Sequence, residues 1–580
     1  MKKHNRSKKI FTPSTIVATI AQALDRDLRI PNQVYGDKQN ATKMLMDRQR
    51  EEFTKKFSDP LNSKDDLETV TFIKFLLVNQ HMRDFGKVEL DLPEPHMCRP
   101  QSRYSKRHNI LLRARALMHS VLTPFVDEEW FYHCKHSGGS SLGVPYSDTS
   151  IEAKSSFPIS ITSGARLIFE DYLSHDAMLR DALLKFNKAN PVTGRYEIVE
   201  GSRATTVPKS DSIRRMIAIE PTGNMFLQQG LMEMMYDRMK RVALDVELLP
   251  ERHRRRAKRA SITSEEATID FSSASDCVSI ELLRWLIPPK WFDCLNAVRS
   301  PYIIIDGEKC ELNMFSTMGN AGTFPLETLV FWTLGHACRL QELRTLSSFP
   351  EWKDLKRVSV FGDDCIVPSY MAEDFMSVCE SVGFIVNKEK SFFDGGGFRE
   401  SCGGDYLRGF DVRPYNVKAP TSVSINNLEP WLYIIFNSLY AKYKLCFGEL
   451  MCVADMDLWR CMVELFGQYD ISVKLVPDHF PDDSGLKISQ DIDRIDDAYP
   501  GLKLSRIGKS ANNRHDFLFL RYNYRQTRKR FDYLHYAIWL KRPGGERSPW
   551  WIQRKRGGYV VARGQTSFWS IPVLTNRNPV

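Results

Sequence analysis

Apolar and polar positions alternate in residues 358–367, which read Val-Ser-Val-Phe-Gly-Asp-Asp-Cys-Ile-Val. This pattern predicts a short strand, a tight turn and a second short strand. Gly362 supplies the backbone freedom that lets such a turn close. The turn places Asp363 and Asp364 at the tip of a buried hairpin. A solvated surface turn explains the same ten residues equally well when they are considered alone.

A second short strand is predicted at residues 267–270, followed by an amphipathic helix that stops at Pro288-Pro289. The apolar stripe of this helix consists of Val278, Leu282, Trp285 and Leu286. Asp270 therefore falls at the end of an apolar strand, where its side chain projects from the sheet edge. Asp276 falls at or near the start of the helix, and capping of the helix N-terminus is its alternative, structural role.

Between these two acidic segments, residues 315–325 read Phe-Ser-Thr-Met-Gly-Asn-Ala-Gly-Thr-Phe-Pro. They predict a glycine-rich loop that leads into a helix, with Pro325 at its first position. The buried stripe expected for that helix is Leu326, Leu329, Val330, Leu334 and Ala337. The loop offers backbone, hydroxyl and amide groups to a nucleotide, although a plain connection between two core elements is an equally good interpretation. Residues 305–308, Ile-Asp-Gly-Glu, indicate a hairpin.

Outside this region the patterns are less specific. Prolines 93, 95 and 100 predict an extended connection, and residues 137–143 predict a loop in which backbone N–H groups bind phosphate or which simply lies on the surface. Beyond residue 425, helical patterns give way to a segment rich in tyrosine, tryptophan and arginine.

Composition narrows the class of protein. A chain of 580 residues predicts several domains, and 42% hydrophobic with 26% charged residues is typical of a soluble globular protein. The twelve cysteines form no Cys-x-x-Cys pair, which argues against a zinc ribbon or a disulfide framework. No apolar run has transmembrane length, and no apolar core follows the basic N-terminus. These features favour a cytosolic protein without a membrane partner.

The charge distribution favours a polyanionic partner. Lysine and arginine exceed aspartate and glutamate by 81 to 71, a net charge of +10. The basic residues gather in residues 1–10, 252–259, 525–530 and 554–556. Several basic patches on a folded protein point most simply to nucleic acid. Solvated helix faces and chain ends are the alternative for any one patch.

The acidic turn and the basic segments suggest a metal and a phosphate. Two carboxylates at the tip of a buried hairpin are costly unless a cation neutralises them, and a divalent metal suits carboxylate oxygens. Upstream, residues 205–221 place three cations where they can meet phosphate: Lys209, Arg214 and Arg215. Downstream, Asn387-Lys-Glu-Lys-Ser391 and Phe398-Arg-Glu-Ser-Cys-Gly403 complete the series.

The order of these motifs resembles that of RNA-dependent RNA polymerases: a basic loop, Asp-x5-Asp, Ser-x-x-Gly-Asn, Gly-Asp-Asp and a lysine segment. Their wording is similar to that of the replicase β subunit of the positive-strand RNA bacteriophages, the Qβ-like group. Four segments carry the similarity most specifically: Thr-Val-Pro-Lys, Ile-Asp-Phe-Ser-Ser-Ala-Ser-Asp, Ser-Thr-Met-Gly-Asn and Phe-Gly-Asp-Asp. The resemblance covers about residues 200–415. Phe361, where many polymerases carry tyrosine, and the basic segment 252–259 depart from it.

The resemblance implies an RNA-directed RNA polymerase that joins rNTPs by a two-metal mechanism, with two Mg²⁺ ions, or Mn²⁺ in their place. Asp270 and Asp363 are expected to bridge the ions, with Asp364 nearby as a less certain ligand. Lys209, Arg214 and Arg215 would hold the incoming triphosphate. Lys390 is a candidate proton donor to pyrophosphate; Lys388 is its rival, and a surface salt bridge is the structural alternative. The residues expected to contact the ribose or nucleotide are Asp276, Ser316, Gly319 and Asn320.

The fold implied is α+β, a right-handed polymerase with fingers, an antiparallel palm sheet backed by helices, and a thumb. The expected boundaries are an N-terminal region at 1–100, a candidate to pack with the thumb, fingers at 101–225, palm with inserted fingers elements at 226–425, and thumb with the C-terminal region at 426–580. The basic and aromatic C-terminal residues either line an RNA path or belong to the thumb core: Arg528, Lys529, Arg530, Trp539, Trp550 and Trp551.

The implied partners are RNA template and product, rNTPs, the host elongation factors Tu and Ts, and the large messenger-binding ribosomal protein. The implied location is the cytoplasm of an infected bacterium. Three rival functions stand beside this one: a reverse transcriptase, a non-catalytic RNA-binding or assembly protein with a degenerate palm, and a metal-dependent hydrolase. Asn320 and the sequence around Asp276 argue against a reverse transcriptase. The retained carboxylates and Lys209 argue against a degenerate, non-catalytic palm. The upstream basic segment argues against a metal-dependent hydrolase, which has no need of it.

Overall fold

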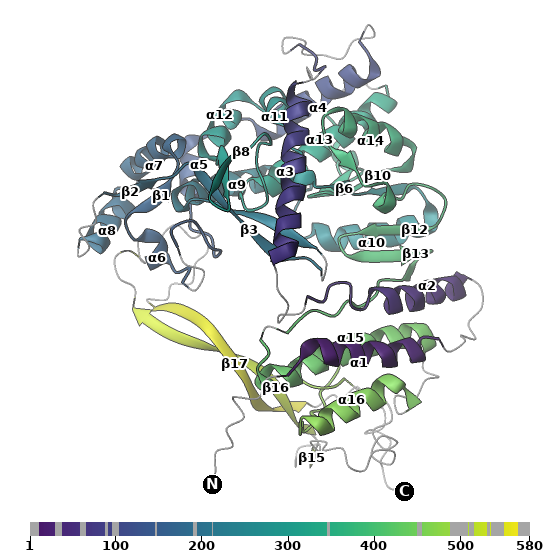
Figure 1. Cartoon of the computed structure of the whole chain (residues 1–580). Helices are drawn as coiled ribbons and strands as arrows, with labels where there is room; N and C mark the ends of the chain where they lie inside the picture. Colours follow the sequence, from purple (N-terminus) through teal and green to yellow (C-terminus); the bar gives the residue numbers. More distant parts are fainter. Residues whose placement is uncertain are drawn as a thin grey trace.

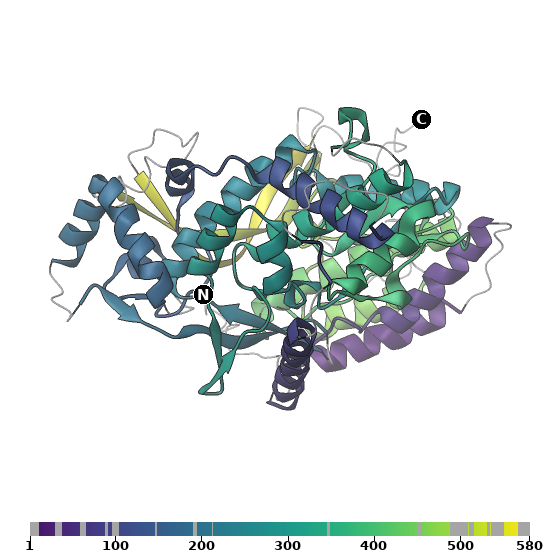
Figure 2. The ribbon, with the colours of Figure 1, turned by 90° about the horizontal axis from the view of Figure 1, so that it is seen from above.

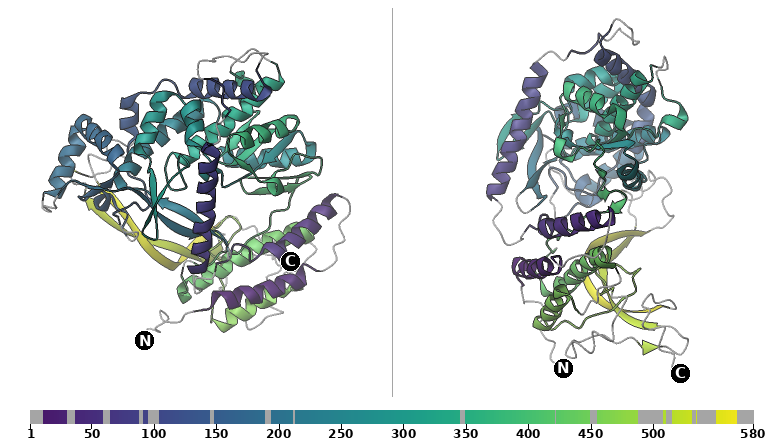
Figure 3. Two further views of the ribbon diagram at one scale, coloured as in Figure 1. Left: turned by 45° about the horizontal axis from the view of Figure 1, so that its top comes forward. Right: turned by 90° about the vertical axis from the view of Figure 1, so that its right-hand side faces the viewer.

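The computed structural model describes residues 11–29, 37–58, 65–87, 91–94, 104–144, 148–188, 194–210, 213–344, 349–420, 422–448, 455–487, 508–509, 515–530, 534 and 550–566. Helices and small, mostly antiparallel sheets share this part of the chain, so the predicted α+β class is confirmed. Two lobes lie one above the other in the view of Figure 1, and Figure 3 shows them from the side.

The centre of the upper lobe is a three-stranded antiparallel sheet in the order β5-β10-β9. Its strands are β5 (Glu266–Ile269), β10 (Asp364–Pro368) and β9 (Ser359–Phe361). Their apolar residues are buried, except Phe361, which is partly buried, because three helices pack against this sheet or against one another behind it. These are α10 (Leu249–Thr263), α13 (Thr323–Glu342) and α14 (Ala372–Ser381) (Figure 1).

Two smaller strand groups extend this centre. β6 (Phe271–Ser272) pairs with β11 (Ile385–Val386), directly after the end of β5. The hairpin of β12 (Phe398–Ser401) and β13 (Gly404–Leu407), with β14 (Phe410–Asp411) beside it, lies along α10.

A four-stranded sheet in the order β4-β3-β7-β8 lies beside the centre. Its strands are β3 (Gly201–Pro208), β4 (Arg214–Ile219), β7 (Tyr302–Ile305) and β8 (Glu308–Glu311). The hairpin predicted at residues 305–308 is the β7–β8 turn and is confirmed. Helix α3 (Asp65–Lys87) packs on β4 and stands out from the front of the molecule when seen from above (Figure 2).

Helices build the rest of the upper lobe around the buried helix α9 (Thr222–Arg241). The others are α4 (Lys106–Leu122), α5 (Asp127–His133), α6 (Ile151–Ser155), α7 (Ser163–His175), α8 (Ala177–Asn187), α11 (Ile280–Leu286) and α12 (Pro289–Val298). Two short parallel strands, β1 (Ile159–Ile161) and β2 (Tyr196–Ile198), complete it. One continuous apolar core joins these helices to the central sheet.

The lower lobe has a second core, formed by the two ends of the chain. Its N-terminal helices are α1 (Pro13–Asp27) and α2 (Asp37–Glu52), and its C-terminal ones are α15 (Ile425–Phe447) and α16 (Asp457–Gln468). α1 packs on α16 and α2 on α15. The domain boundaries drawn from the sequence stay a prediction.

A long antiparallel hairpin follows, made of β16 (His515–Arg530) and β17 (Trp550–Thr566), with the short β15 (Gly508–Lys509) at its base. It is the yellow ribbon of Figure 1, and its far end points toward α6 of the upper lobe. The sequence did not predict these strands. Trp539 and the side chains of Arg528, Lys529, Arg530, Trp550 and Trp551 lie outside the described residues, as do residues 1–10.

Two helix starts differ from the sequence-based expectation. The helix after Asp276 begins at Ile280, and its cap is Ser279, whose hydroxyl accepts from the N–H of Leu282 at 3.1 Å. Asp276 instead ends a single 3₁₀ turn, so the alternative, capping role for it is excluded. Helix α13 begins at Thr323, which makes Pro325 its third residue rather than its first.

Candidate active site

Asp270 and Asp363 come together because the central strands run antiparallel. Cys365 pairs with Ile269, so the end of β5 lies beside the turn between β9 and β10. Gly362 holds this turn at φ +62°, and its N–H donates to the Thr328 hydroxyl of α13 at 3.0 Å. Both aspartates line one cavity of about 630 Å³. The strand–turn–strand prediction for residues 358–367 is confirmed.

The two carboxylates are electrostatically strained. Burial raises the pKa of Asp270, and the charge of Asp363 raises it further. Burial also raises the pKa of Asp363. Lys390 and Lys209 act in the opposite direction on both groups, and the Asn387 amide donates to Asp270 Oδ2 at 2.8 Å. Burial therefore disfavours the charged form of both carboxylates, a cost that a bound cation relieves.

Asp364 faces a different way from Asp363. It is not among the described residues that line the cavity. Its Oδ1 accepts from the Ser401 hydroxyl at 3.3 Å, and its Oδ2 accepts from the N–H of Cys402 at 3.2 Å. Burial, and then the charge of Asp363, raise the pKa of Asp364 to about 6. The structure thus separates the two aspartates of the turn into one that faces the cavity and one that is held by the β12–β13 hairpin.

The predicted cations meet these carboxylates from the β3–β4 hairpin and from the segment after β11. Lys209, Arg214, Arg215 and Lys390 line the cavity, whereas Lys388 does not. Burial lowers the pKa of Lys209, and so do the charges of Arg215, Lys390 and Lys74. Lys74 of α3 also lines the cavity and was missed in the sequence, where one lysine in a long amphipathic helix gives no signal.

Arg214 is bound by groups of the protein itself, which the sequence did not predict. Its guanidinium donates to the hydroxyl of Thr206 at 2.6 Å and to the carbonyl of Thr206 at 3.0 Å. It also pairs with Glu68 of α3 at 3.2 Å. Arg214 therefore ties the β3–β4 hairpin to α3, and Arg215 beside it is the arginine whose charge acts on Asp363 and Asp276.

The residues predicted to contact the ribose separate into two groups. Asp276, Gly319 and Asn320 line the cavity, but Ser316 does not. Ser316 is 3% exposed, and its hydroxyl accepts from the hydroxyl of Thr323 at 3.0 Å. Gly319 has φ +120°, and a Cβ there would lie 2.0 Å from the carbonyl oxygen of Ala218. Ser316 thus supports the loop from within, and Gly319 lets the loop press against β4.

Asp276 is a buried carboxylate with unused bonding capacity. It is 8% exposed, and its Oδ1 has no hydrogen-bond partner among the described residues. Burial raises its pKa to about 7, although the charge of Arg215 and the N–H of Met318 oppose that rise. A buried acceptor that faces a cavity without a partner is suited to a ligand hydroxyl or a cation.

Glu327 of α13 is a fourth acidic group of the cavity, and the sequence-based prediction missed it. It is 2% exposed and accepts from the Ser275 hydroxyl at 2.9 Å. Burial and the charge of Asp363 raise its pKa to about 8, with a smaller effect from Asp276. The sequence did contain a signal for it: Glu327 is a lone acid within the apolar run after Pro325. Acidic residues are rarely buried unless they have a partner or a function.

Carboxylate oxygens are the ligands that Mg²⁺ prefers, so the donor set of the cavity fits such an ion. In the described part of the chain, three potential ligand atoms lie within 4.8 Å of one another at Glu129, His133 and Asp237, not at the predicted carboxylates. Glu129 is already paired with Arg238 at 2.5 Å, which neutralises that group without a metal.

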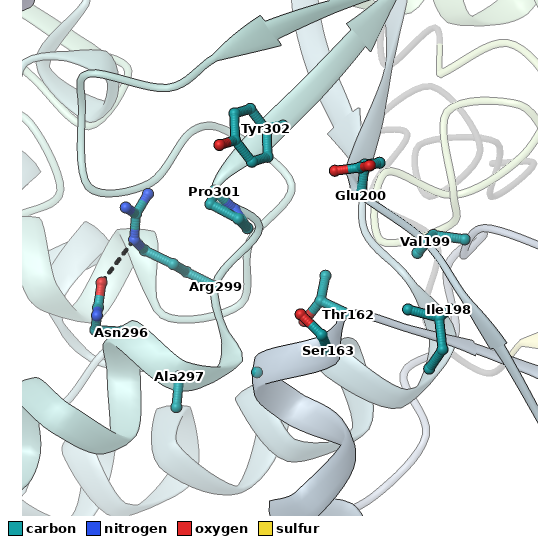
Figure 4. A pocket seen from close by; sticks show the side chains of 11 residues that line it. Thr162, Ser163, Ile198, Val199, Glu200, Asn296, Ala297, Arg299, Pro301 and Tyr302 are labelled. Atoms are coloured by element: carbon teal, nitrogen blue, oxygen red, sulfur yellow. Dashed lines mark hydrogen bonds between the residues drawn. The ribbon is translucent and has the colours of Figure 1, made fainter.

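A second cavity, of about 430 Å³, lies between α7, α12 and the start of β7 (Figure 4). None of the predicted site residues lines it. The Arg299 side chain is turned toward Asn296, to which it donates at 2.9 Å, and away from Ser163 at the start of α7. This cavity therefore does not share the chemistry of the first one. No helix among the described residues has the length and apolar character needed to cross a membrane.

Comparison with known proteins gives consistent matches. The RNA-directed RNA polymerase beta chain of Escherichia phage MS2 is 31% identical over 357 residues, 61% of this chain and 60% of that protein. The corresponding chain of Enterobacteria phage fr is 30% identical over 55% of this chain and 56% of its own. The RNA-directed RNA polymerase subunit beta of Escherichia virus Qbeta is 37% identical over 257 residues, 42% of each chain.

These alignments span about three fifths or less of the relatives' own length. Among solved structures, the RNA-dependent RNA polymerase of a human picorbirnavirus matches 80% of this chain and 83% of its own, with a TM-score of 0.43 and 13% identity. The model of the family described as RNA replicase, beta-chain, matches residues 18–451, which is most of the chain and includes the whole acidic cavity. The chain therefore belongs to the RNA replicase beta-chain family.

Proposed function

We propose that this chain is the catalytic subunit of a phage RNA replicase, which copies an RNA template from rNTPs by nucleotidyl transfer. The observation that carries the proposal is the cavity in which Asp270 and Asp363 face Lys209, Arg215 and Lys390. An acidic pair beside a group of cations is what phosphoryl transfer needs, because the metal and the triphosphate must be bound side by side. Family membership supports the same activity.

In this proposal Asp270 and Asp363 hold the metal ions, with Asp364 close behind them. Mg²⁺ is the expected ion, with Mn²⁺ as a substitute; when bound, it supplies activation of the attacking 3′ oxygen and charge neutralisation on the phosphates. The chain's own residues do the remaining work. Lys209, Arg214, Arg215 and Lys74, which line the cavity, attract and orient the triphosphate, and Lys390 gives a proton to the departing pyrophosphate.

Ribonucleotide selection is assigned to Asp276 and the loop before α13. Asp276 offers a buried acceptor oxygen, and Gly319 and Asn320 of this loop line the same cavity. A ribose 2′-hydroxyl that donates to Asp276 satisfies this oxygen, whereas a deoxyribose leaves it without a partner. Ser316 acts on this loop only through Thr323.

The expected partners are RNA template and product, the host elongation factors Tu and Ts, and the large messenger-binding ribosomal protein. The expected location is the cytoplasm of an infected bacterium. These follow from the family and are proposals for this chain. The test is RNA synthesis by the purified full-length chain with a defined RNA template, Mg²⁺ and four rNTPs, with and without added bacterial elongation factors.

Asp363→Asn is the decisive variant in that assay. It keeps the size of the side chain but removes the charge expected to hold the metal, so we expect incorporation to fall by a factor of about 10³ or more. Because the ionised group is destabilised by burial, the melting temperature of this variant without metal should not fall. Full RNA synthesis by Asp363→Asn would rule out the catalytic assignment and favour a non-catalytic RNA-binding protein. Equal use of dNTPs and rNTPs by the wild type would favour a reverse transcriptase.

A further inference from the structure

Helix α10 carries the basic segment 252–259, which has no place in the proposed chemistry. Arg256 is held at the edge of the central sheet, where it pairs with Glu266 at 2.7 Å and donates to the carbonyl of Lys356 at 2.8 Å. A histidine within this basic run points inward instead. His253 is 0% exposed and lies between β9 and β12.

The His253 ring contacts one serine on each side. Its Nδ1 lies 3.0 Å from the Ser401 hydroxyl of β12, and its Nε2 lies 2.9 Å from the Ser359 hydroxyl of β9. Ser401 in turn donates to Oδ1 of Asp364 at 3.3 Å. The two serines are 1% and 2% exposed, so water does not compete for these bonds.

The carboxylate fixes the direction of every proton in this chain of contacts. An ionised carboxylate only accepts, so Ser401 must give its single proton to Asp364. The Ser401 oxygen then accepts from His253, which requires the proton on Nδ1. A neutral imidazole has one N–H, so Nε2 accepts and Ser359 donates to it. Burial, with the charges of Arg256 and Arg252, lowers the pKa of His253 to about 3, which keeps the ring neutral.

We propose that His253 and Ser401 are positioning residues that hold the Asp364 carboxylate in its place directly behind the metal-binding aspartates. The chain of hydrogen bonds runs Ser359–His253–Ser401–Asp364, and the N–H of Cys402 holds the other oxygen of the same carboxylate at 3.2 Å. The inference rests on the proposed function, since it concerns how the second aspartate of the acidic turn is held.

The hydrogen bonds that hold Asp364 connect the β9–β10 hairpin with two flanking elements, α10 and β12. Ser359 lies on β9 and Asp364 at the start of β10, so both ends of the chain of bonds belong to the same hairpin. His253 and Ser401 brace this hairpin from α10 and from β12, which flank it. The orientation of Asp364 is thereby set by the protein before a cation or a nucleotide binds, which is how groups around a ligand are made ready in advance.

The test compares Ser401→Ala, His253→Phe and the double variant with the wild type. Ser261→Ala is the matched control: Ser261 is 1% exposed on the same helix, donates to the Lys258 carbonyl at 2.7 Å and accepts from the Gly409 N–H at 2.8 Å. The first readout is the affinity of the resting full-length chain for Mn²⁺, followed by electron paramagnetic resonance without nucleotide. The second is the Mg²⁺ concentration that gives half-maximal RNA synthesis.

We expect Ser401→Ala to weaken Mn²⁺ binding and to raise the half-maximal Mg²⁺ concentration, each by about tenfold, because the partners of a metal ligand have effects of that size. Ser401→Thr keeps the hydroxyl and should restore wild-type values. His253→Phe should have a smaller effect in the same direction. The double variant should be no worse than Ser401→Ala, since both changes interrupt one chain of bonds.

Three results would overturn the inference: metal responses of Ser401→Ala equal to those of Ser261→Ala, losses that add fully in the double variant, or a lower melting temperature as the sole change. If His253→Phe does not fold, Ser401→Ala and Ser401→Thr decide the matter without it. Failure of the proposed function is a separate outcome, because it would show as absent RNA synthesis by the wild type. The Mn²⁺ affinities would still test the role of Ser401.

Discussion

At the scale of single residues, the cavity combines acids that resist ionisation with cations that partly offset them. Burial raises the pKa values of Asp270, Asp276 and Glu327, and the charge of Asp363 raises those of Asp270 and Glu327 further, whereas Lys390 and Lys209 lower that of Asp270. Without a cation these carboxylates destabilise the folded chain when they ionise. These opposing effects make two residue-level predictions possible.

The first concerns pH. Glu327 has a pKa of about 8 in the folded chain against 4.5 for the free side chain. Because the pKa of Glu327 is raised in the folded state, the contribution of this side chain to the stability of the folded chain is complete below about pH 4.5. That contribution is lost as the pH rises through about 8. Between about pH 6 and pH 8, Glu327 should lower the free energy of unfolding of the metal-free chain by about 2 kcal/mol. Glu327→Gln should remove that part of the slope.

Urea unfolding of both chains at the two pH values, in the presence of a chelator, measures this difference. The glutamine keeps an acceptor for the Ser275 hydroxyl, so the hydrogen bond at 2.9 Å is preserved in the comparison. Equal slopes for the two proteins would mean that Glu327 ionises in the folded chain as it does in water.

The second residue-level prediction concerns Lys388 and Lys390, the two lysines after β11. Lys390 lines the cavity and acts on Asp270 and Asp363, whereas Lys388, two residues away on the same short turn, does not line it. Lys390→Leu should slow single-turnover nucleotide incorporation by a factor of about 10² to 10⁴, the usual range for loss of a proton donor. Lys388→Leu is the control and should stay within about twofold of wild type. Equal losses in the two variants would contradict the assignment of Lys390.

At the scale of elements, the sequence predicted what local patterns control. The β9–β10 hairpin, the end of β5 at Asp270 and the β7–β8 turn were all foreseen, because alternation and turn residues act within a few positions. The start of α11 was misplaced, because Ser279 and Asp276 are both good capping residues and only the fold decides between them.

Contacts between elements that lie far apart along the chain could not be predicted from the sequence. Lys74 reaches the cavity because α3 packs on β4, and Glu327 because α13 lies behind β9. The turning of Asp364 toward Ser401 depends on β12, some forty residues further along the chain. The ion pair of Arg214 with Glu68 could not be predicted either, because it depends on the packing of α3 on β4.

The loop before α13 gives a prediction at this scale. Gly319 has φ +120°, and the Ala218 carbonyl occupies the space a Cβ would need. Gly319→Ala should displace the loop from β4, raise the KM for rNTPs and lower stability by roughly 2 to 3 kcal/mol. Gly139→Ala is the control, because nothing lies within 4 Å of a Cβ at that position. Steady-state kinetics with thermal unfolding test this, and an unchanged KM in Gly319→Ala would exclude the loop from nucleotide binding.

At the scale of the whole molecule, the two ends of the chain depend on each other. The second core contains apolar residues of α1 and α2 together with those of α15 and α16, so neither pair of helices buries its apolar face alone. The upper lobe has its own continuous core. A chain with two cores that share few elements is expected to unfold in more than one step when one core is weakened.

Asp27 is the residue on which that division can be tested. It lies at the end of α1, 3% exposed, and its carboxylate accepts from the N–H groups of Asp457 and Leu458 at 2.8 and 2.9 Å and from the Tyr443 hydroxyl at 2.8 Å. It thus caps α16 from the other end of the chain, since Met456 at the start of that helix has no side-chain cap of its own.

Asp27→Ala should leave three buried donors without their acceptor and destabilise the lower lobe by about 2 to 4 kcal/mol. We expect faster hydrogen exchange in peptides of α15 and α16, with exchange in α13 and the central sheet unchanged, because the first core does not include Asp27. Asp25→Ala on the same helix is the control, since the Asp25 side chain is 41% exposed and pairs with Arg29 and Arg50. Faster exchange throughout the chain in Asp27→Ala would mean that the two lobes form a single cooperative unit, and that the ends of the chain support the catalytic cavity directly.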